Sequence, residues 1–301
     1  MDLTFHTLDV FTGQRFGGNP LAVVLGADGL DTALMQTITR EFNLSETIFV
    51  MKPRDPANTA AVRIFCPGSE MPFAGHPTLG CAILLAELKN KQTCNFETEI
   101  RLEEVAGLVP VKVTRIGGPS RGMFTAPVIP FVAGEAPDTK SIAAALGLDA
   151  SEIGFDTHRP AVIEGGPRFF FIPVASRAVL ERAQVREPAW GDVTSSADVD
   201  NTYVYAKGGE GKDASFRSRM FAPAAGIAED PATGSATALL ARQILQSESL
   251  ADGTHRFVLE QGYEMGRPSD LILEATVRDR DLVSVRVGGQ AVRVSAGTIT
   301  L

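Results

Sequence analysis

The 301-residue sequence contains few of the residues on which disulfide-bonded and metal-binding proteins depend. It has three cysteines, four histidines and one tryptophan. The cysteines, Cys66, Cys81 and Cys94, are odd in number and follow no CxxC spacing, which disfavours a disulfide framework and a structural zinc site. An HExxH pattern is also missing, so no metal ion is expected. A reducing cytoplasm is the expected location.

Positive charge and long apolar runs are scarce as well. The chain has 28 Lys and Arg against 36 Asp and Glu, a net charge of −8. Binding to a nucleic-acid backbone or an anionic membrane needs excess cationic surface, so neither partner is expected. The longest apolar run without charge, residues 71–86, is shorter than the roughly 20 residues of a membrane-spanning helix. Neither GxGxxG nor GxxxxGK[ST] occurs, so no nucleotide site is predicted.

The sequence is rich in short β-type runs separated by turn residues, and its hydrophobic content of 44% is enough for a core. Helices are predicted over 31–42, with Asp31 as N-cap, and over 139–147, ending at Gly147. Two further helical segments, 76–88 and 230–242, are apolar on nearly every face. Such helices must be enclosed, so each is predicted to be a central helix inside a curved β-sheet.

The two apolar segments align with each other, which indicates an internal duplication. His76 pairs with Asp230 at an offset of 230 − 76 = 154, and upstream Arg63 pairs with Arg219 at 219 − 63 = 156. We therefore predict an α+β protein of two pseudo-symmetric domains, residues 1–118 and 119–287. The last strand, about 288–301, packs back onto the first domain. A cleft between two such domains is a preferred place for a small-molecule site.

The starts of the two central helices are the predicted site. Exposed N–H groups at a helix start are electropositive and hold a carboxylate or an oxyanion. Proton transfer needs side chains, and His76, Asp230 and Glu46, which lies between the first helix and a strand, are the candidates. In a cleft with little water Glu46 becomes a usable base. Each residue also has a plain structural interpretation: Asp230 as an N-cap, His76 as a loop histidine, Glu46 as a solvated carboxylate.

Several segments together resemble the phenazine-biosynthesis PhzF-like family over essentially the whole chain. They are Asp9–Thr12 with Gly18–Val23, Asn43–Thr47, Glu70–Gly80, Glu229–Ala236 and Gln261–Ser269. The resemblance implies a diaminopimelate-epimerase-like fold in a cofactor-free homodimer. It also implies isomerisation of a small carboxylate such as trans-2,3-dihydro-3-hydroxyanthranilate.

The resemblance also assigns roles to residues. Glu46 moves a proton from one substrate carbon to another, and His76 and Asp230 assist. The expected carboxylate cradle is the backbone near Gly75, Gly234 and Ser235, with Ser45 and Thr233 as further substrate-binding residues.

Two alternatives stay open at this point. Related epimerases use a cysteine at each helix start, but here those positions hold His76 and Asp230, and Cys81 lies one turn inside the first helix. A two-thiol racemase is therefore disfavoured, although a one-base racemase or epimerase is not. The other alternative is a paralogue that binds a small molecule without turnover.

Overall fold

The computed structural model describes residues 2–90 and 94–301, and the chain forms two compact units. Unit 1 contains the residues up to 125 together with 288–301, and unit 2 contains residues 126–287. The boundary lies after Thr125 instead of residue 118 because strand β8 (Arg121–Thr125) pairs with β7 (Gly107–Arg115) of unit 1. The C-terminal part of β17 (Asp281–Thr300) pairs with β1 (Asp2–Val10), which places it in unit 1.

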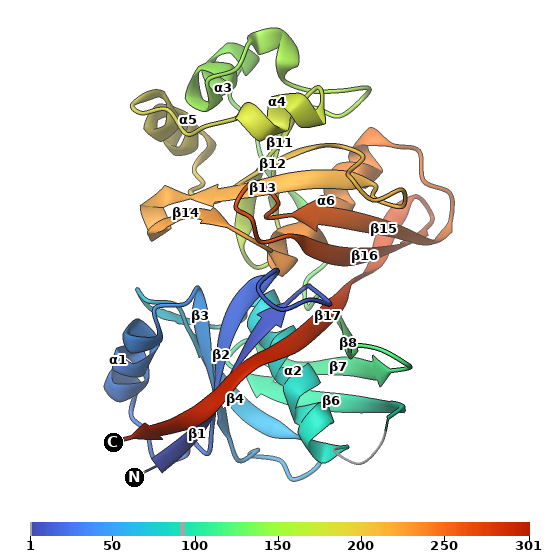
Figure 1. Ribbon diagram of the computed structural model, residues 1–301. Helices are drawn as coiled ribbons and strands as arrows, with labels where there is room; N and C mark the ends of the chain where they lie inside the picture. Colours follow the sequence, from blue (N-terminus) through green and yellow to red (C-terminus); the bar gives the residue numbers. More distant parts are fainter. Residues whose placement is uncertain (1, 91–93) are drawn as a thin grey trace. The chain divides into compact units, whose positions relative to one another are not determined.

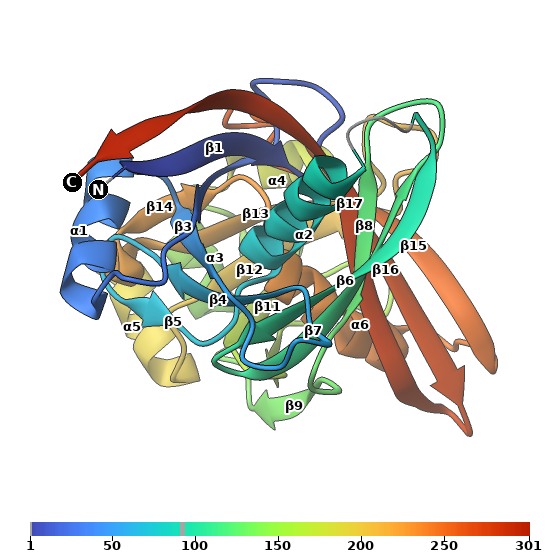
Figure 2. The same cartoon turned by 90° about the horizontal axis from the view of Figure 1, so that it is seen from below.

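Unit 1 is a curved sheet around one helix (Figures 1 and 2). Its strands are hydrogen-bonded in the order β17–β1–β2–β3–β4–β6–β7–β8, and β8 also pairs with β17, so the sheet closes. The remaining elements have these bounds: β2 (Asn19–Leu25), α1 (Thr32–Phe42), β3 (Glu46–Met51), β4 (Ala60–Phe65), β5 (Glu70–Met71), α2 (Gly75–Lys89) and β6 (Phe96–Glu104).

Helix α2 lies inside this sheet, as its apolar sequence predicts. It contacts β1, β2, β3, β6, β7 and β8, and its side chains are buried on all faces over the first ten residues. Gly80 allows the close approach, because a Cβ there would lie 2.6 Å from Leu21 Cδ2 and 2.7 Å from Val10 Cγ2.

Unit 2 repeats the arrangement with additions. Its strands are hydrogen-bonded in the order β9–β10–β11–β12–β13–β15–β16, with β14 on β13, and α6 contacts β9, β10, β11 and β16. The bounds are β9 (Phe131–Gly134), α3 (Thr139–Leu146), β10 (Ala161–Glu164), β11 (Arg168–Pro173), α4 (Arg177–Arg182), α5 (Ala189–Ala197), β12 (Thr202–Lys207), β13 (Phe216–Ala222), β14 (Ile227–Asp230), α6 (Gly234–Ser247), β15 (Gly253–Gln261) and β16 (Ser269–Arg278). Short 3₁₀ turns occupy Ala150–Glu152 and Pro223–Ala225.

The duplication extends from topology to side chains. In unit 1, β4 forms a hairpin with β5, α2 follows, and β6 returns parallel to β4; in unit 2, β13, β14, α6 and β15 repeat this path. Arg63 on β4 pairs with Glu70 on β5, and Arg219 on β13 pairs with Glu229 on β14. Two pseudo-symmetric halves are thus confirmed, and the aligned Arg63 and Arg219 form the same ion pair in both.

The local predictions for the shorter helices are confirmed as well. Asp31 caps α1 by accepting a hydrogen bond from the N–H of Leu34, and α3 ends at Gly147, whose φ of 67° suits glycine. The prediction for α6 is wrong at its start, because the helix begins at Gly234 and not at Asp230. None of the helices in the described part of the chain is long and apolar enough to cross a membrane.

Candidate active site

In unit 1, Glu46 and His76 lie against each other. Strands β2 and β3 are parallel neighbours, with Leu21 opposite Glu46. Their N-terminal ends therefore lie side by side at the same end of the strands. Helix α2 begins next to these strand ends and carries His76 in its first turn. The His76 Nε2 atom lies 3.1 Å from Glu46 Oε2, and both side chains are buried.

Burial determines the charge of His76. It lowers the pKa of His76 to about 3, against a smaller opposing effect of a hydrogen bond to the backbone of Pro20. Because proline has no backbone N–H, the imidazole N–H must donate to the Pro20 carbonyl. The nitrogen that faces Glu46, Nε2, is then a proton acceptor in the neutral ring. Because the ring carries no positive charge, it does not oppose protonation of the adjacent Glu46 carboxylate, which suits a general base.

In unit 2, Asp230 is held by two neighbours, Thr233 and Gln261. Asp230 is the last residue of β14 and Thr233 is the N-cap of α6. The Thr233 hydroxyl donates to Asp230 Oδ2 at 2.5 Å, and Gln261 Nε2 donates to the Asp230 carbonyl at 2.8 Å. All three side chains are buried.

These bonds explain why α6 begins later than its sequence suggests. Pro231 has no N–H, the Thr233 N–H donates to Gln261 Oε1, and the Asp230 carbonyl accepts from the Gln261 amide. The polar backbone groups that would start a helix at Asp230 are thus satisfied by a residue 31 positions away. Asp230 therefore lies before the helix, whereas His76 lies inside the first turn of its own.

The other predicted residues lie beside these two groups. Ser45 directly precedes β3 and Gly75 is the first residue of α2; Gly234 and Ser235 are the first two residues of α6. The N-caps of both helices, Ala74 and Thr233, make no side-chain bond to a helix N–H. Each helix start can therefore present N–H groups to an anion.

Cys81 is unsuited to acid–base work. It lies in the middle of α2 and is fully buried, and burial together with the nearby Glu104 carboxyl raises the pKa of its thiol. A thiol that stays protonated cannot abstract a proton from carbon, which counts further against a thiol racemase.

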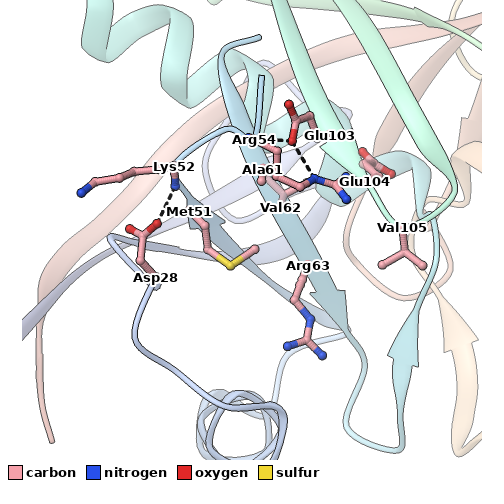
Figure 3. Close-up of a pocket in the computed structure, with 10 residues that line it drawn as sticks. All are labelled: Asp28, Met51, Lys52, Arg54, Ala61, Val62, Arg63, Glu103, Glu104 and Val105. Carbon is pink, nitrogen blue, oxygen red and sulfur yellow. Dashed lines mark hydrogen bonds and ion pairs between the residues drawn. The ribbon is translucent and has the colours of Figure 1, made fainter. Parts of the chain in front are cut away.

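A pocket of about 470 Å³ on unit 1 is a different feature (Figure 3). The residues that line this pocket come from the loop at Asp28 and from β3, β4 and β6, and they include Met51, Arg63 and Glu104. Glu46 and His76 are not among these lining residues, so the pocket is not the predicted site.

Sequence reasoning missed Gln261 and the Pro20 carbonyl. Gln261 stands in a segment that carries the family resemblance, but nothing in its neighbourhood along the chain connects it with Asp230. Pro20 contributes only a backbone carbonyl, for which no side-chain pattern exists. Both contacts join residues that lie far apart in the sequence.

Comparison with solved structures identifies the fold. The chain superimposes on a Bacillus anthracis phenazine biosynthesis protein of the PhzF family, with a TM-score of 0.89, 23% identity and full coverage of both chains. It also matches a hydroxyproline epimerase from Agrobacterium vitis, with a TM-score of 0.63, 14% identity and coverage of 100% of this chain and 93% of the other. The fold is therefore the mixed α+β fold that PhzF-family proteins share with this epimerase.

Sequence relatives narrow the class to one family. An uncharacterized isomerase of Mesorhizobium japonicum is 43% identical, with 97% of this chain and 96% of the relative covered. A trans-2,3-dihydro-3-hydroxyanthranilate isomerase of Pseudomonas chlororaphis is 34% identical, with 98% of each covered. The model of the phenazine biosynthesis-like protein family matches residues 8–297. The chain belongs to this family and is an isomerase.

Proposed function

We propose that the isomerase moves a proton between two carbons of a small carboxylate substrate, with Glu46 as base and then as acid. The observation that carries this proposal is the buried pair of Glu46 Oε2 and His76 Nε2, 3.1 Å apart at the start of α2. Glu46 can take up a proton from carbon beside this imidazole because the neutral ring places no positive charge against the carboxyl group.

Asp230 and the helix starts complete the proposed chemistry. Asp230 assists the proton transfer in unit 2, and the backbone at Gly75, Gly234 and Ser235 holds the substrate carboxylate and the negative charge that develops on it, with Ser45 and Thr233 beside them. An acidic protein can bind an anion in this way, because the attraction comes from backbone N–H groups and not from surface Lys and Arg.

The first substrate to test is trans-2,3-dihydro-3-hydroxyanthranilate, since relatives at 34% identity are named for it. The experiment follows turnover and solvent deuterium incorporation in D₂O for wild type, Glu46→Gln and Glu97→Gln. Glu97 is an exposed glutamate of unit 1 and serves as the matched control. We expect Glu46→Gln to lose about 10²- to 10⁴-fold in kcat and Glu97→Gln to behave as wild type. Full turnover with unchanged deuterium incorporation in Glu46→Gln would remove Glu46 from the mechanism.

The alternatives lead to different products. A one-base epimerase would invert a stereocentre without moving a double bond, which chiral chromatography of the product detects. A silent paralogue would bind the carboxylate, as a thermal shift reveals, with no turnover.

The remaining parts of the proposal rest on the family resemblance or, for the location, on the cysteine usage. They are a homodimer, a cytoplasmic location and activity without a cofactor. Light scattering after gel filtration tests the dimer, and turnover after exhaustive dialysis against a chelator tests the absence of a cofactor.

A further inference from the structure

Gln261 is a buried residue with no place in the mechanism so far. It ends β15, is fully buried, and its amide makes three hydrogen bonds around the start of α6. Nε2 donates to the Asp230 carbonyl at 2.8 Å and to Thr233 Oγ1 at 2.9 Å, and Oε1 accepts from the Thr233 N–H at 3.1 Å.

The backbone determines which way this amide points. The Thr233 N–H can only donate and the Asp230 carbonyl can only accept, so the Gln261 oxygen must face the first and its nitrogen the second. Thr233 Oγ1 thus accepts a hydrogen bond from Gln261 Nε2. Its own single proton is then directed to Asp230 Oδ2, 2.5 Å away.

We propose that Gln261 is a positioning residue which, through Thr233, keeps Asp230 Oδ2 as a hydrogen-bond acceptor and directs proton exchange at this carboxyl to Oδ1. Gln261 donates to Thr233, and Thr233 donates to Asp230. The first donor in this series, the Gln261 amide, cannot change its protonation state. The ionised form of Asp230 is therefore favoured over the protonated form. The catalytic consequence rests on the proposed function of Asp230, but the bonding pattern does not.

Unit 1 has a counterpart to this arrangement, which supports the inference. Glu104 ends β6 as Gln261 ends β15, and its Oε1 lies 2.7 Å from the hydroxyl of Thr78 in the first turn of α2. Thr78 Oγ1 also lies 2.7 Å from the Ala74 carbonyl, which can only accept. If the threonine donates to Ala74, Glu104 must be the donor. Both units therefore place a buried polar side chain from a strand end against a threonine hydroxyl at the helix start.

Tyr203 is a titratable residue of unit 2 that interacts electrostatically with Asp230. Its phenol is fully buried, and burial raises its pKa to about 12. It stays neutral over the pH range in which a carboxyl titrates, so it does not obscure the measurement.

The test measures protonation of Asp230 directly. The full-length protein is labelled with ¹³C-carboxyl aspartate, and the Asp230 signal is assigned by its absence in Asp230→Asn. It is followed from pH 3 to pH 8 in wild type, Gln261→Met and Thr233→Val. Gln243→Met is the matched control, because Gln243 is an equally buried amide in unit 2 that binds Tyr205 and Arg159 instead.

We expect the pH at which Asp230 takes up its proton to rise by about one to two pH units in Gln261→Met and Thr233→Val, and not in Gln243→Met. With a working substrate, kcat falls and its acid limb moves by the same amount. The proposal is overturned if neither variant moves the midpoint, if only Thr233→Val does, or if Gln243→Met moves it equally.

Two further outcomes are assigned in advance. Should Gln261→Met fail to fold, Gln261→Glu replaces it, since it keeps the shape but supplies no permanent donor, and the same upward shift is required of it. Should wild type fail to turn over any carboxylate, the proposed function fails while the titration still decides the role of Gln261.

Discussion

The buried carboxyl of Glu104 should make the stability of the protein depend on pH in a defined direction. The Glu104 side chain is 3% exposed and faces Thr78 and Cys81, and burial raises its pKa from 4.5 to about 8. Between these two values the folded protein holds a proton that the unfolded chain has released. Stability is therefore unaffected by this group below pH 4.5, falls as the pH rises to 8, and is constant above that.

The size of the effect follows from the two pKa values. A difference of roughly 3.5 units at ~1.4 kcal/mol per unit amounts to about 5 kcal/mol, which is a large part of the stability of an ordinary domain. Glu104→Gln removes the titration but keeps an amide that can donate to Thr78, as Gln261 does to Thr233 in unit 2. The variant should match wild type near pH 5 and exceed it by several kcal/mol at pH 8.5.

Urea unfolding followed by far-ultraviolet circular dichroism measures this difference at pH 5, 7 and 8.5. Circular dichroism is chosen because Trp190, the sole tryptophan of the sequence, belongs to unit 2. Glu97→Gln, an exposed change on the same strand, corrects for the general effect of losing a carboxylate. If the stability difference between Glu104→Gln and wild type is the same at pH 5 and pH 8.5, the reasoning about this buried carboxyl is wrong.

Two further predictions concern the cores of the units. Arg217 is buried against Glu264 at 3.0 Å, so Arg217→Met should cost about 3–5 kcal/mol by leaving buried carboxylate charge unpaired, whereas Lys207→Met at an exposed pair should cost at most ~1 kcal/mol. Equal losses in thermal unfolding would contradict this. Gly80→Ala should destabilise by about 1–3 kcal/mol because its Cβ would overlap β1 and β2, while Gly118→Ala, with open space around it, should be nearly neutral. A stabilised Gly80→Ala would show that helix propensity outweighs the overlap.

Much of the fold can be read from the sequence because its signals are local. The helix around Gly80 is apolar on all sides, and only an enclosing sheet can satisfy such a helix. Asp31 and Gly147 act on the nearest turn of backbone, so their capping roles follow from residue type. Helices α4 and α5 were not predicted; they are short, and they join the packed layer around Trp190 and Phe221.

For the candidate site, too, the sequence identifies some features and only the structure shows the others. Residue type and motif single out Glu46, His76 and Asp230, since few side chains can move a proton. Their immediate partners could not be predicted. Glu46 contacts His76 because two parallel strands and a helix begin side by side. Asp230 lies before α6 because Gln261 forms hydrogen bonds with the backbone around it.

By itself the sequence determined that the protein is a duplicated α+β protein with two enclosed helices, since composition and periodicity are properties of neighbouring residues, and its family resemblance implied an isomerase. Only the tertiary structure decided the protonation chemistry. The neutral His76, the protonated Glu104 and the directed bonds from Gln261 to Asp230 all depend on burial and on partners far along the chain. Removal from water and the geometry of a few hydrogen bonds control where a proton resides, and neither is encoded at any single position.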